Sequence, residues 1–511
     1  MRSRIPIGWL IGILTAFVAV GVGEAVAVLV RPAAAPLIAV GNRVIVLTPE
    51  SWKHYLIGQV GTEDKRYLIV GICVVLGLVA ALAGELALRR VWVGLLGVAV
   101  IGGFAVYCAA TAPAARGSDV VPSLVGAVVA AAVLVGLVRL ARPGHAPDGR
   151  AAPLLADRRL FLAGSGAAAA LAALAGFGGR AAQHARFDVT AERRKVALPA
   201  AANRSTAPTG TDLGKSGVPW RTPNKQFYRI DTALTVPQID PDSWHLRIHG
   251  LVDHPMTLSF KDLLARELED HWVTLNCVSN EVGGQLVSNA LFRGARLDAL
   301  LREAGVQSGS DQLLMRSEDG MTIGAPTKAV MDGRAALLAV GMNGVALPVE
   351  HGFPVRVVVP GLYGYISACK WVVDIEATTF AAHQAYWVRG GWVKDAPIRI
   401  ASRIDRPSFN EVLDAGEPYA IAGVAWDQHV GIAKVEVQID GGPWLAARLA
   451  KVPSDDTWRQ WVYAWTPEKS GRYTIKVRAT DAHGRVQDAK VRDTFPSGSS
   501  GLHSVSGHVV V

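Results

Sequence analysis

The sequence predicts three parts in series: a helical membrane region, a mixed α+β domain and an all-β sandwich. Half of the 511 residues are hydrophobic and the mean hydropathy is +0.26, so the chain is too long and too apolar for one ordinary soluble domain. Long apolar runs gather in the first third of the chain. Near the C-terminal end, hydrophobic residues instead alternate with polar ones, a pattern typical of half-buried strands.

Residues 1–179 contain five apolar runs that we expect to be membrane-spanning helices. Each run is close to the ~20 residues that cross a hydrocarbon core of ~30 Å, and charged residues are confined almost entirely to the flanks. The five runs are residues 7–30, 67–88, 91–112, 120–140 and 160–178.

Basic residues predict the orientation of these spans, because Lys and Arg near span ends stay cytoplasmic. Arg2 and Arg4 precede the first run, Arg89 and Arg90 separate the second from the third, and Arg139, at the end of the fourth run, is followed by four arginines before the fifth. The N-terminus is therefore expected inside, and everything after Gly179 outside the cytoplasm. The same distribution explains the net charge of +9 without a nucleic-acid partner.

Arg158 and Arg159, followed by Leu-Phe-Leu and an Ala/Gly-rich run, resemble a twin-arginine export signal placed inside the chain. An ordinary positive-inside pair would account for them equally well. If the domain that follows must be folded in the cytoplasm before export, the twin-arginine route is favoured.

The remainder of the chain divides by composition and periodicity. Residues 180–219 are rich in Ala, Arg, Thr, Gly and Pro without periodicity, which predicts a linker. Residues 220–385 mix short strands with short helices such as 297–303. Residues 398–495 carry period-two strands with turns between them, which predicts an immunoglobulin-like sandwich.

Cys277 is the residue with the most informative surroundings. The chain has four cysteines, and their spacing suggests neither a disulfide framework nor a Cys-His zinc site. A thiol without a partner is a packing residue, a nucleophile or a metal ligand. The local sequence, Leu275-Asn-Cys-Val-Ser-Asn280, leaves these readings open.

Several segments taken together resemble the sulfite oxidase family of molybdenum enzymes. The residues after 398 are similar to the family's dimerisation domain, through 423–427 and 435–442. The segments that carry the resemblance to the catalytic domain are 227–231, 244–250, 275–280, 294–301, 336–344, 351–361 and Lys370-Trp371.

The resemblance implies a molybdenum–molybdopterin cofactor and assigns roles to individual residues. Cys277 would be the protein ligand of the metal, because a soft thiolate suits it. Arg229 would contact an oxyanion substrate, Lys370 and Arg356 would face the pterin phosphate, and Asn280 would order the loop beside the cofactor. The alternatives are that Lys370 is a solvated surface residue and that Arg356 is a structural charge.

Two positions depart from the family pattern. Val340 stands where sulfite oxidases have a tyrosine near the metal, and Asp231 stands where they have a histidine. Tyr363 and Tyr365 are candidates to supply the missing phenol.

The resemblance implies an oxidoreductase that is anchored in the membrane, faces away from the cytoplasm and transfers an oxygen atom to or from a small substrate. No span contains a histidine, so no haem is expected, and electrons would pass to a separate cytochrome or quinone-linked carrier. A homodimer formed through the sandwich is also expected. Two alternatives remain: a reductase of sulfoxide-like substrates, and a non-catalytic membrane receptor or scaffold.

Overall fold

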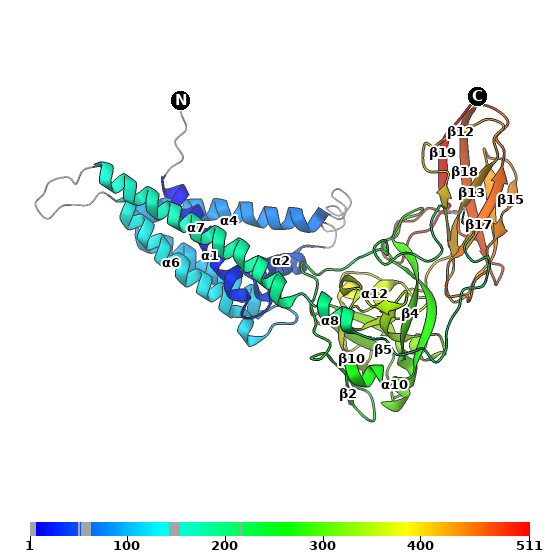
Figure 1. The fold of residues 1–511 in the computed structure, drawn as a ribbon, viewed down its shortest axis with the longest axis horizontal. Coiled ribbons are helices and arrows are strands. Elements are labelled where there is room, and N and C mark those ends of the chain that lie inside the picture. Colours follow the sequence, from blue (N-terminus) through cyan, green and yellow to red (C-terminus); the bar gives the residue numbers. More distant parts are fainter. Residues whose placement is uncertain (1–6, 50–51, 53–62, 143–153, 215–216) are drawn as a thin grey trace, which may run out of the picture. The chain divides into compact units, whose positions relative to one another are not determined.

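The structure, a computed structural model, describes residues 7–49, 52, 63–142, 154–214 and 217–511. It divides into two compact units. The helical unit comprises Met1–Asp188 and Ala233–Gln238, and the head comprises Val189–Thr232 and Ile239–Val511. Each is described by itself (Figure 1).

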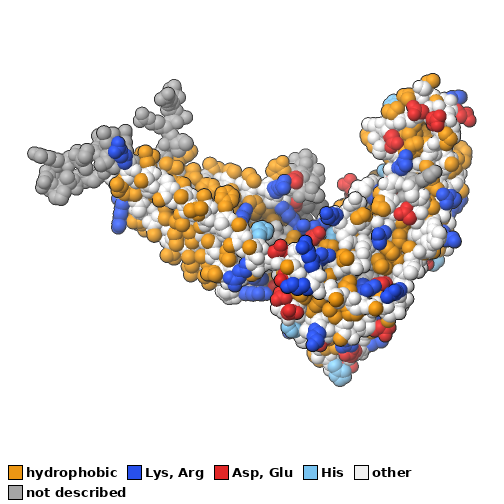
Figure 2. All heavy atoms as spheres, viewed as in Figure 1, with side chains coloured by type: hydrophobic (Ala, Val, Ile, Leu, Met, Phe, Trp, Pro, Cys, Tyr) orange, Lys and Arg blue, Asp and Glu red, His pale blue; other side chains and the backbone are white. Residues whose placement is uncertain are grey.

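Five helices in the described part of the helical unit are long and apolar enough to cross a membrane. Hydrophobic side chains cover much of their visible surface (Figure 2), as they would for helices facing lipid. The helices are α1 (Ile7–Ala27), α4 (Asp64–Arg89), α5 (Val91–Ala110), α6 (Val121–Ala141, after the short turn η3, Gly117–Val120) and α7 (Leu154–Phe187).

Helix α1 packs against α4, α6 and α7, and glycines make the closest contact possible. A Cβ atom on Gly12 would lie 1.8 Å from the carbonyl oxygen of Ala80, and one on Gly84 would lie 2.2 Å from that of Gly8. Small residues at such crossings let helix backbones approach closely, which favours packing inside a bilayer.

Residues 180–219 are expected to form a linker, but the first residues of this stretch are helical. Helix α7 continues to Phe187, and Gln183 donates a 2.8 Å hydrogen bond to the carbonyl of Glu24 on α1. Arg180 lies 3.6 Å from the buried Glu24 carboxylate. Ala and Arg, which dominated the composition of this stretch, are strong helix formers, and tertiary contacts with α1 extend the helix.

The expected loop between the first two spans also contains structure. A turn, η1 (Pro32–Ala34), leads into the short apolar helix α2 (Pro36–Leu47), which starts with a proline in its first turn. Residues 233–238 join this part of the unit. Lys65 donates a 2.7 Å hydrogen bond to the carbonyl of Ala233.

Arg2, Arg4 and the side chain of Arg158 lie outside the described residues. The orientation of the spans and the twin-arginine signal therefore stay predictions.

The first part of the head contains one mixed sheet and one antiparallel sheet, and a hydrophobic core packs against the antiparallel one. Helix α10 has the bounds predicted from the sequence, Leu297–Glu303. One sheet has the order β2 (Met256–Ser259), β1 (His245–Gly250), β10 (Val372–Thr378), β5 (Gln312–Ser317), β6 (Thr322–Pro326). The other has the order β3 (Leu268–Asn276), β4 (Val287–Arg296), β7 (Leu337–Met342), β8 (Val345–Ala346), with β9 (Arg356–Val358) also paired to β7. The short helical elements are α8 (Thr190–Lys195), α9 (Phe260–Leu264), α11 (Thr327–Met331), η4 (Val349–His351), α12 (Gly364–Ser367) and α13 (Tyr386–Arg389).

The second part of the head is the expected all-β sandwich, and it extends beyond the predicted end at residue 495. Its last strand pairs antiparallel with β18 and parallel with β12. The core between the sheets includes Trp461, Val435 and Ile475. One sheet has the order β11 (Ala401–Arg406), β13 (Tyr419–Trp426), β17 (Arg459–Trp465), β16 (Arg448–Leu449); the other has the order β12 (Val412–Asp414), β19 (Ser504–Val510), β18 (Gly471–Asp481), β14 (Ile432–Ile439), β15 (Trp444–Ala446).

Candidate functional site

Cys277 lies directly after β3, at the start of the loop that leads to β4, and its side chain is 9% exposed. The Cys277 N–H donates to the carbonyl of Leu286 at 2.9 Å. The Asn280 N–H donates to the carbonyl of Cys277 at 3.0 Å, and the Asn280 side-chain oxygen accepts from the Leu286 N–H at 2.8 Å. Asn280 thus closes the loop on itself and fixes the direction of the thiol.

Burial raises the pKa of the Cys277 thiol above its ordinary value, although hydrogen bonds from Ser279 act in the opposite direction. The neutral thiol is therefore the stable form when nothing binds it. A metal ion would displace the proton, because the thiolate is the ligand form.

The sandwich holds the same loop from outside, although it lies more than a hundred residues further along the chain. Ser499 donates a 2.7 Å hydrogen bond to the carbonyl of Asn280. The guanidinium of Arg403, which is 2% exposed, donates to the carbonyl of Gly284 at 2.8 Å. At Gly283, where φ is +80°, a Cβ would lie 2.3 Å from the His503 ring.

Strand β3, which precedes Cys277, is fixed by the sandwich as well. The Thr274 N–H donates to the carbonyl of Asp456 at 3.0 Å, and the Thr274 hydroxyl accepts from the Trp458 N–H at 2.8 Å. Gln428 donates to the Thr274 carbonyl at 3.3 Å. These hydrogen bonds satisfy polar groups of Thr274 on β3, the edge strand of its sheet. Both parts of the head therefore position the thiol.

A second group of predicted residues meets around one carboxylate. Asp231 accepts a 2.7 Å hydrogen bond from Arg229 Nε and one of 2.9 Å from Lys370 Nζ. Asp231 and Lys370 are largely buried, whereas the Arg229 side chain is 39% exposed. The residue that departs from the family pattern at position 231 therefore holds two of the predicted cations together.

Arg356 adds a third cation to this group. Its side chain is 4% exposed, its Nη1 donates to the His351 carbonyl at 3.2 Å, and its guanidinium lies over the Phe292 ring. Its Nε–H has no hydrogen-bond partner among the described residues. Burial lowers the pKa of Arg356 to about 10.

Burial likewise lowers the pKa of Lys370 to about 8, against the opposing effect of Asp231. Arg229 and Lys370 thus contact the carboxylate of Asp231, and Arg356 lies within electrostatic range of Lys370. Because charges are costly to bury without compensation, such a group is suited to hold an anion.

Tyr228 connects the thiol to the cations. Burial, followed by the nearby Cys277 thiol, raises the pKa of Tyr228, whereas Arg356 lowers it. A Cβ atom on Gly364 would lie 3.5 Å from the Tyr228 hydroxyl, so the start of α12 lies beside the phenol. Sequence reasoning missed Tyr228, although it lies inside the quoted segment 227–231.

The two phenols proposed from the sequence lie in different surroundings. The Tyr363 hydroxyl accepts from the Arg399 N–H at 3.3 Å, and burial raises its pKa to about 12, with Cys277 among the further causes. The Tyr365 hydroxyl donates to the carbonyl of Val393. Val340 is fully buried in β7.

Comparisons with known proteins bear on the family of the chain. Residues 233–387 match the family described as "Oxidoreductase molybdopterin binding domain". The chain is 35% identical over 153 residues to "Uncharacterized oxidoreductase YuiH" of Bacillus subtilis (strain 168), covering 30% of this chain and 74% of that protein. The chain belongs to the molybdopterin-binding oxidoreductase family that includes sulfite oxidase.

Other similar proteins have names that state an activity or a type of domain. The mitochondrial sulfite oxidase of Homo sapiens is 30% identical over 316 residues, covering 52% of this chain but 57% of that protein. Residues 401–477 match the "Bacterial Ig domain" family. A solved structure, the sulfane dehydrogenase SoxCD from Paracoccus pantotrophus, has a TM-score of 0.49 at 23% identity and covers 57% of this chain and 84% of that one.

Membership of this family makes the protein a molybdopterin-dependent oxidoreductase with a molybdenum cofactor. The residues present fit such a group. The unpartnered Arg356 Nε–H and the excess of buried positive charge suit an anionic phosphate, and the buried thiol of Cys277 suits a soft metal.

We predict that Gly283→Ala loosens the Cys277 loop, because the added methyl group meets the His503 ring and the backbone has a positive φ. Such strain costs about 1–3 kcal/mol. In cofactor-free protein, alkylation of Cys277, followed by peptide mass spectrometry, should become at least about tenfold faster.

Gly484→Ala is the matched control, since its φ is +82° and nothing lies within 4 Å of the added atom. Equal acceleration in both variants would show that backbone strain, rather than the contact with His503, sets the accessibility of Cys277.

Proposed function

We propose that this chain is a membrane-anchored oxidoreductase whose head lies outside the cytoplasm and transfers an oxygen atom to or from a small substrate. The observation that carries the proposal is that Tyr228 lies within electrostatic range of both Cys277 and Arg356, which joins the thiol and the cations in one site. The five apolar helices support anchoring, and the basic flanks support the orientation.

The cofactor would be held at its two chemically different ends. Cys277 would bind the metal, Arg356 and Lys370 would bind the pterin phosphate, and Asn280 would keep the loop closed around the thiol. When bound, the cofactor supplies a metal that changes oxidation state, which none of these side chains can do. The buried cations reduce the cost of placing a phosphate away from water.

Arg229 would orient the substrate. Its Nε–H is held by Asp231, which fixes the guanidinium plane while the side chain stays partly exposed. A guanidinium fixed in this way presents a planar fork to an oxyanion or to a sulfoxide-like oxygen.

Tyr228 takes the place of the phenol missing at position 340. Its raised pKa keeps it protonated, so it can donate a hydrogen bond where negative charge develops, and such donors are worth on the order of 10² to 10³ in rate. Val340 contributes only an aliphatic side chain in a strand. A phenol supplied from a different segment than in sulfite oxidases favours a substrate other than sulfite and keeps a sulfoxide-like reductase as the second candidate.

The partners follow from the same features. Because no span carries a histidine, a separate carrier would exchange electrons with the head. A homodimer is supported by exposed apolar side chains at the β12 edge of the sandwich, Phe409, Val412 and Val510, because such an edge favours pairing with a second chain.

We predict that the purified wild-type chain contains about one molybdenum per chain and that Cys277→Ser loses at least about 100-fold of its turnover with an artificial redox dye, because the soft thiolate ligand is replaced. Elemental analysis and dye-linked assays measure both quantities. Cys369→Ala changes the other buried cysteine of the head and should retain the metal and most of the turnover. An active Cys277→Ser enzyme would contradict the proposal.

We also predict that anion binding weakens above about pH 8, because Lys370 loses its proton there whereas an unfolded lysine titrates near 10.4. Sulfate, which does not titrate in this range, serves as the probe in cofactor-free chain, with affinity measured by calorimetry from pH 7 to 9. Lys370→Arg keeps its charge and should bind with little pH dependence. An equal slope in both proteins would rule out Lys370 as the titrating group.

Finally, Phe409→Glu with Val412→Lys should convert a dimer of the full chain into a monomer, because charges replace the apolar edge. Light scattering after size-exclusion chromatography in detergent measures the mass. Val491→Lys, at another exposed apolar position of the head, should leave the dimer intact. A wild-type monomer at micromolar concentration would refute the role of this edge.

A further inference from the structure

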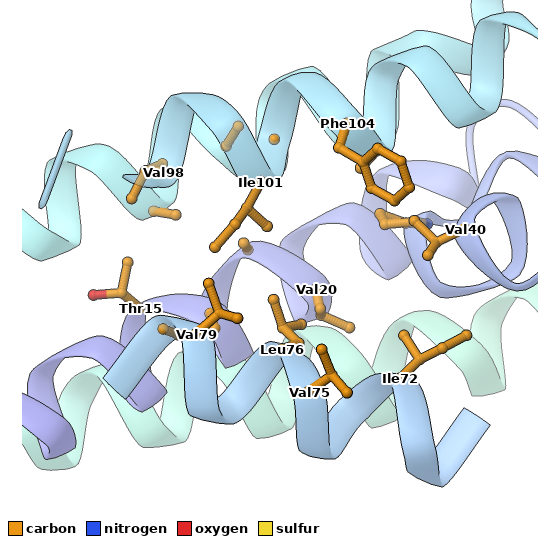
Figure 3. A pocket seen from close by; sticks show the side chains of 18 of the residues that line it. Thr15, Val20, Val40, Ile72, Val75, Leu76, Val79, Val98, Ile101 and Phe104 are labelled. Carbon is orange, nitrogen blue, oxygen red and sulfur yellow. The ribbon is translucent and has the colours of Figure 1, made fainter. Parts of the chain in front are cut away.

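The helical unit contains a partly open cavity of about 610 Å³, a volume within the range of small-molecule sites. Its walls come from α1, α2, α4, α5 and α6 and are almost entirely aliphatic or aromatic. Figure 3 shows Ile101 and Phe104 on one side and Ile72, Val75 and Leu76 on the other. An apolar ligand would fit such walls.

Three wall residues carry a hydroxyl group: Thr15, Ser123 and the exposed Tyr67. Ser123, in the first turn of α6, lines the cavity and is 4% exposed. Its hydroxyl has no hydrogen-bond partner in the described part of the chain, whereas the other hydroxyl deep in the wall, that of Thr15, donates to the Ile11 carbonyl at 2.8 Å. A buried polar group without a partner is costly, so a ligand oxygen beside Ser123 would satisfy it.

The cavity also opens to the outside of the helical unit at α4 and α5. Val75 and Val79 on α4 and Val100 on α5 line the cavity and are 61%, 48% and 63% exposed. On helices that span a membrane, these positions face lipid tails. A ligand dissolved in the bilayer could therefore enter between α4 and α5.

The end of the cavity that holds Ser123 lies at the predicted outer side of the spans. Residues 233–238 pack at the same side: Leu234 reaches Gly41 on α2, as does Ile72, which lines the cavity. This segment begins two residues after Asp231 in the chain. The end of the cavity that holds Ser123 and the segment 233–238 thus lie on the same side of the helical unit.

We propose that this cavity binds a membrane-resident isoprenoid quinone, with a ring oxygen at the Ser123 hydroxyl and the isoprenoid tail along the aliphatic walls. The proposal rests on the proposed function, which requires an electron carrier from outside the chain. A quinone Q balances that reaction: a substrate X and water give XO and the quinol QH₂, two electrons and two protons passing to Q. For a substrate that loses oxygen, the same reaction runs in reverse.

Two pairs of variants test the site in the full chain, purified in detergent. A Cβ atom at Gly71 or at Gly77 meets nothing within 4 Å, but only Gly71 lines the cavity. Gly71→Phe should fill it and weaken binding of a short-chain quinone at least tenfold, whereas Gly77→Phe on the same helix should bind like wild type. Ser123→Ala should weaken binding about threefold to tenfold, and Ser165→Ala, a buried unpartnered serine outside the cavity, should not.

The readout is the dissociation constant of the short-chain quinone, measured without any enzymatic assay. Wild-type binding with the expected losses in Gly71→Phe and Ser123→Ala supports the site. No binding, equal loss in the Gly77→Phe control, or a co-purified phospholipid that the quinone fails to displace would overturn it. Molybdenum content and dye-linked turnover are measured on the same samples, so the head can prove active while the quinone site fails, and the two proposals are separable.

Discussion

Burying a guanidinium costs free energy unless an anion compensates it, and this constraint explains much of the arrangement around Arg356. Asp231 compensates two neighbouring cations, Arg229 and Lys370, through a single oxygen atom. Arg356 keeps an Nε–H without a partner among the described residues. The head therefore holds a prepared place for an anionic group, and this fits the cofactor of its family.

The thiol depends on a different constraint, which is that a loop must be held still for one side chain to bind a metal in a fixed direction. Here the sandwich supplies that restraint through Ser499, Arg403 and His503. Such contacts resemble the outer-shell partners that orient metal ligands in proteins. The sandwich thus stabilises the loop of the site, independently of any role in dimer formation.

Sequence reasoning recovered the features that depend on local pattern. The helix 297–303 has its predicted bounds, and the sandwich matches a bacterial Ig domain. It ended the sandwich at residue 495 and so missed β19, because the pairing with β18 that makes Ser504–Val510 a strand is not a local feature of the sequence. In the site, it named Cys277, but the restraint from Arg403 comes from 119 residues away in the chain and leaves no local signal.

The central claim is that the Cys277 thiolate binds the molybdenum, and X-ray absorption at the molybdenum edge measures this directly. The account predicts that the spectrum of Cys277→Ser, reconstituted with cofactor, lacks one sulfur neighbour present in the wild-type protein. An unchanged sulfur shell in the variant, or a wild-type chain that binds no molybdenum, would contradict it.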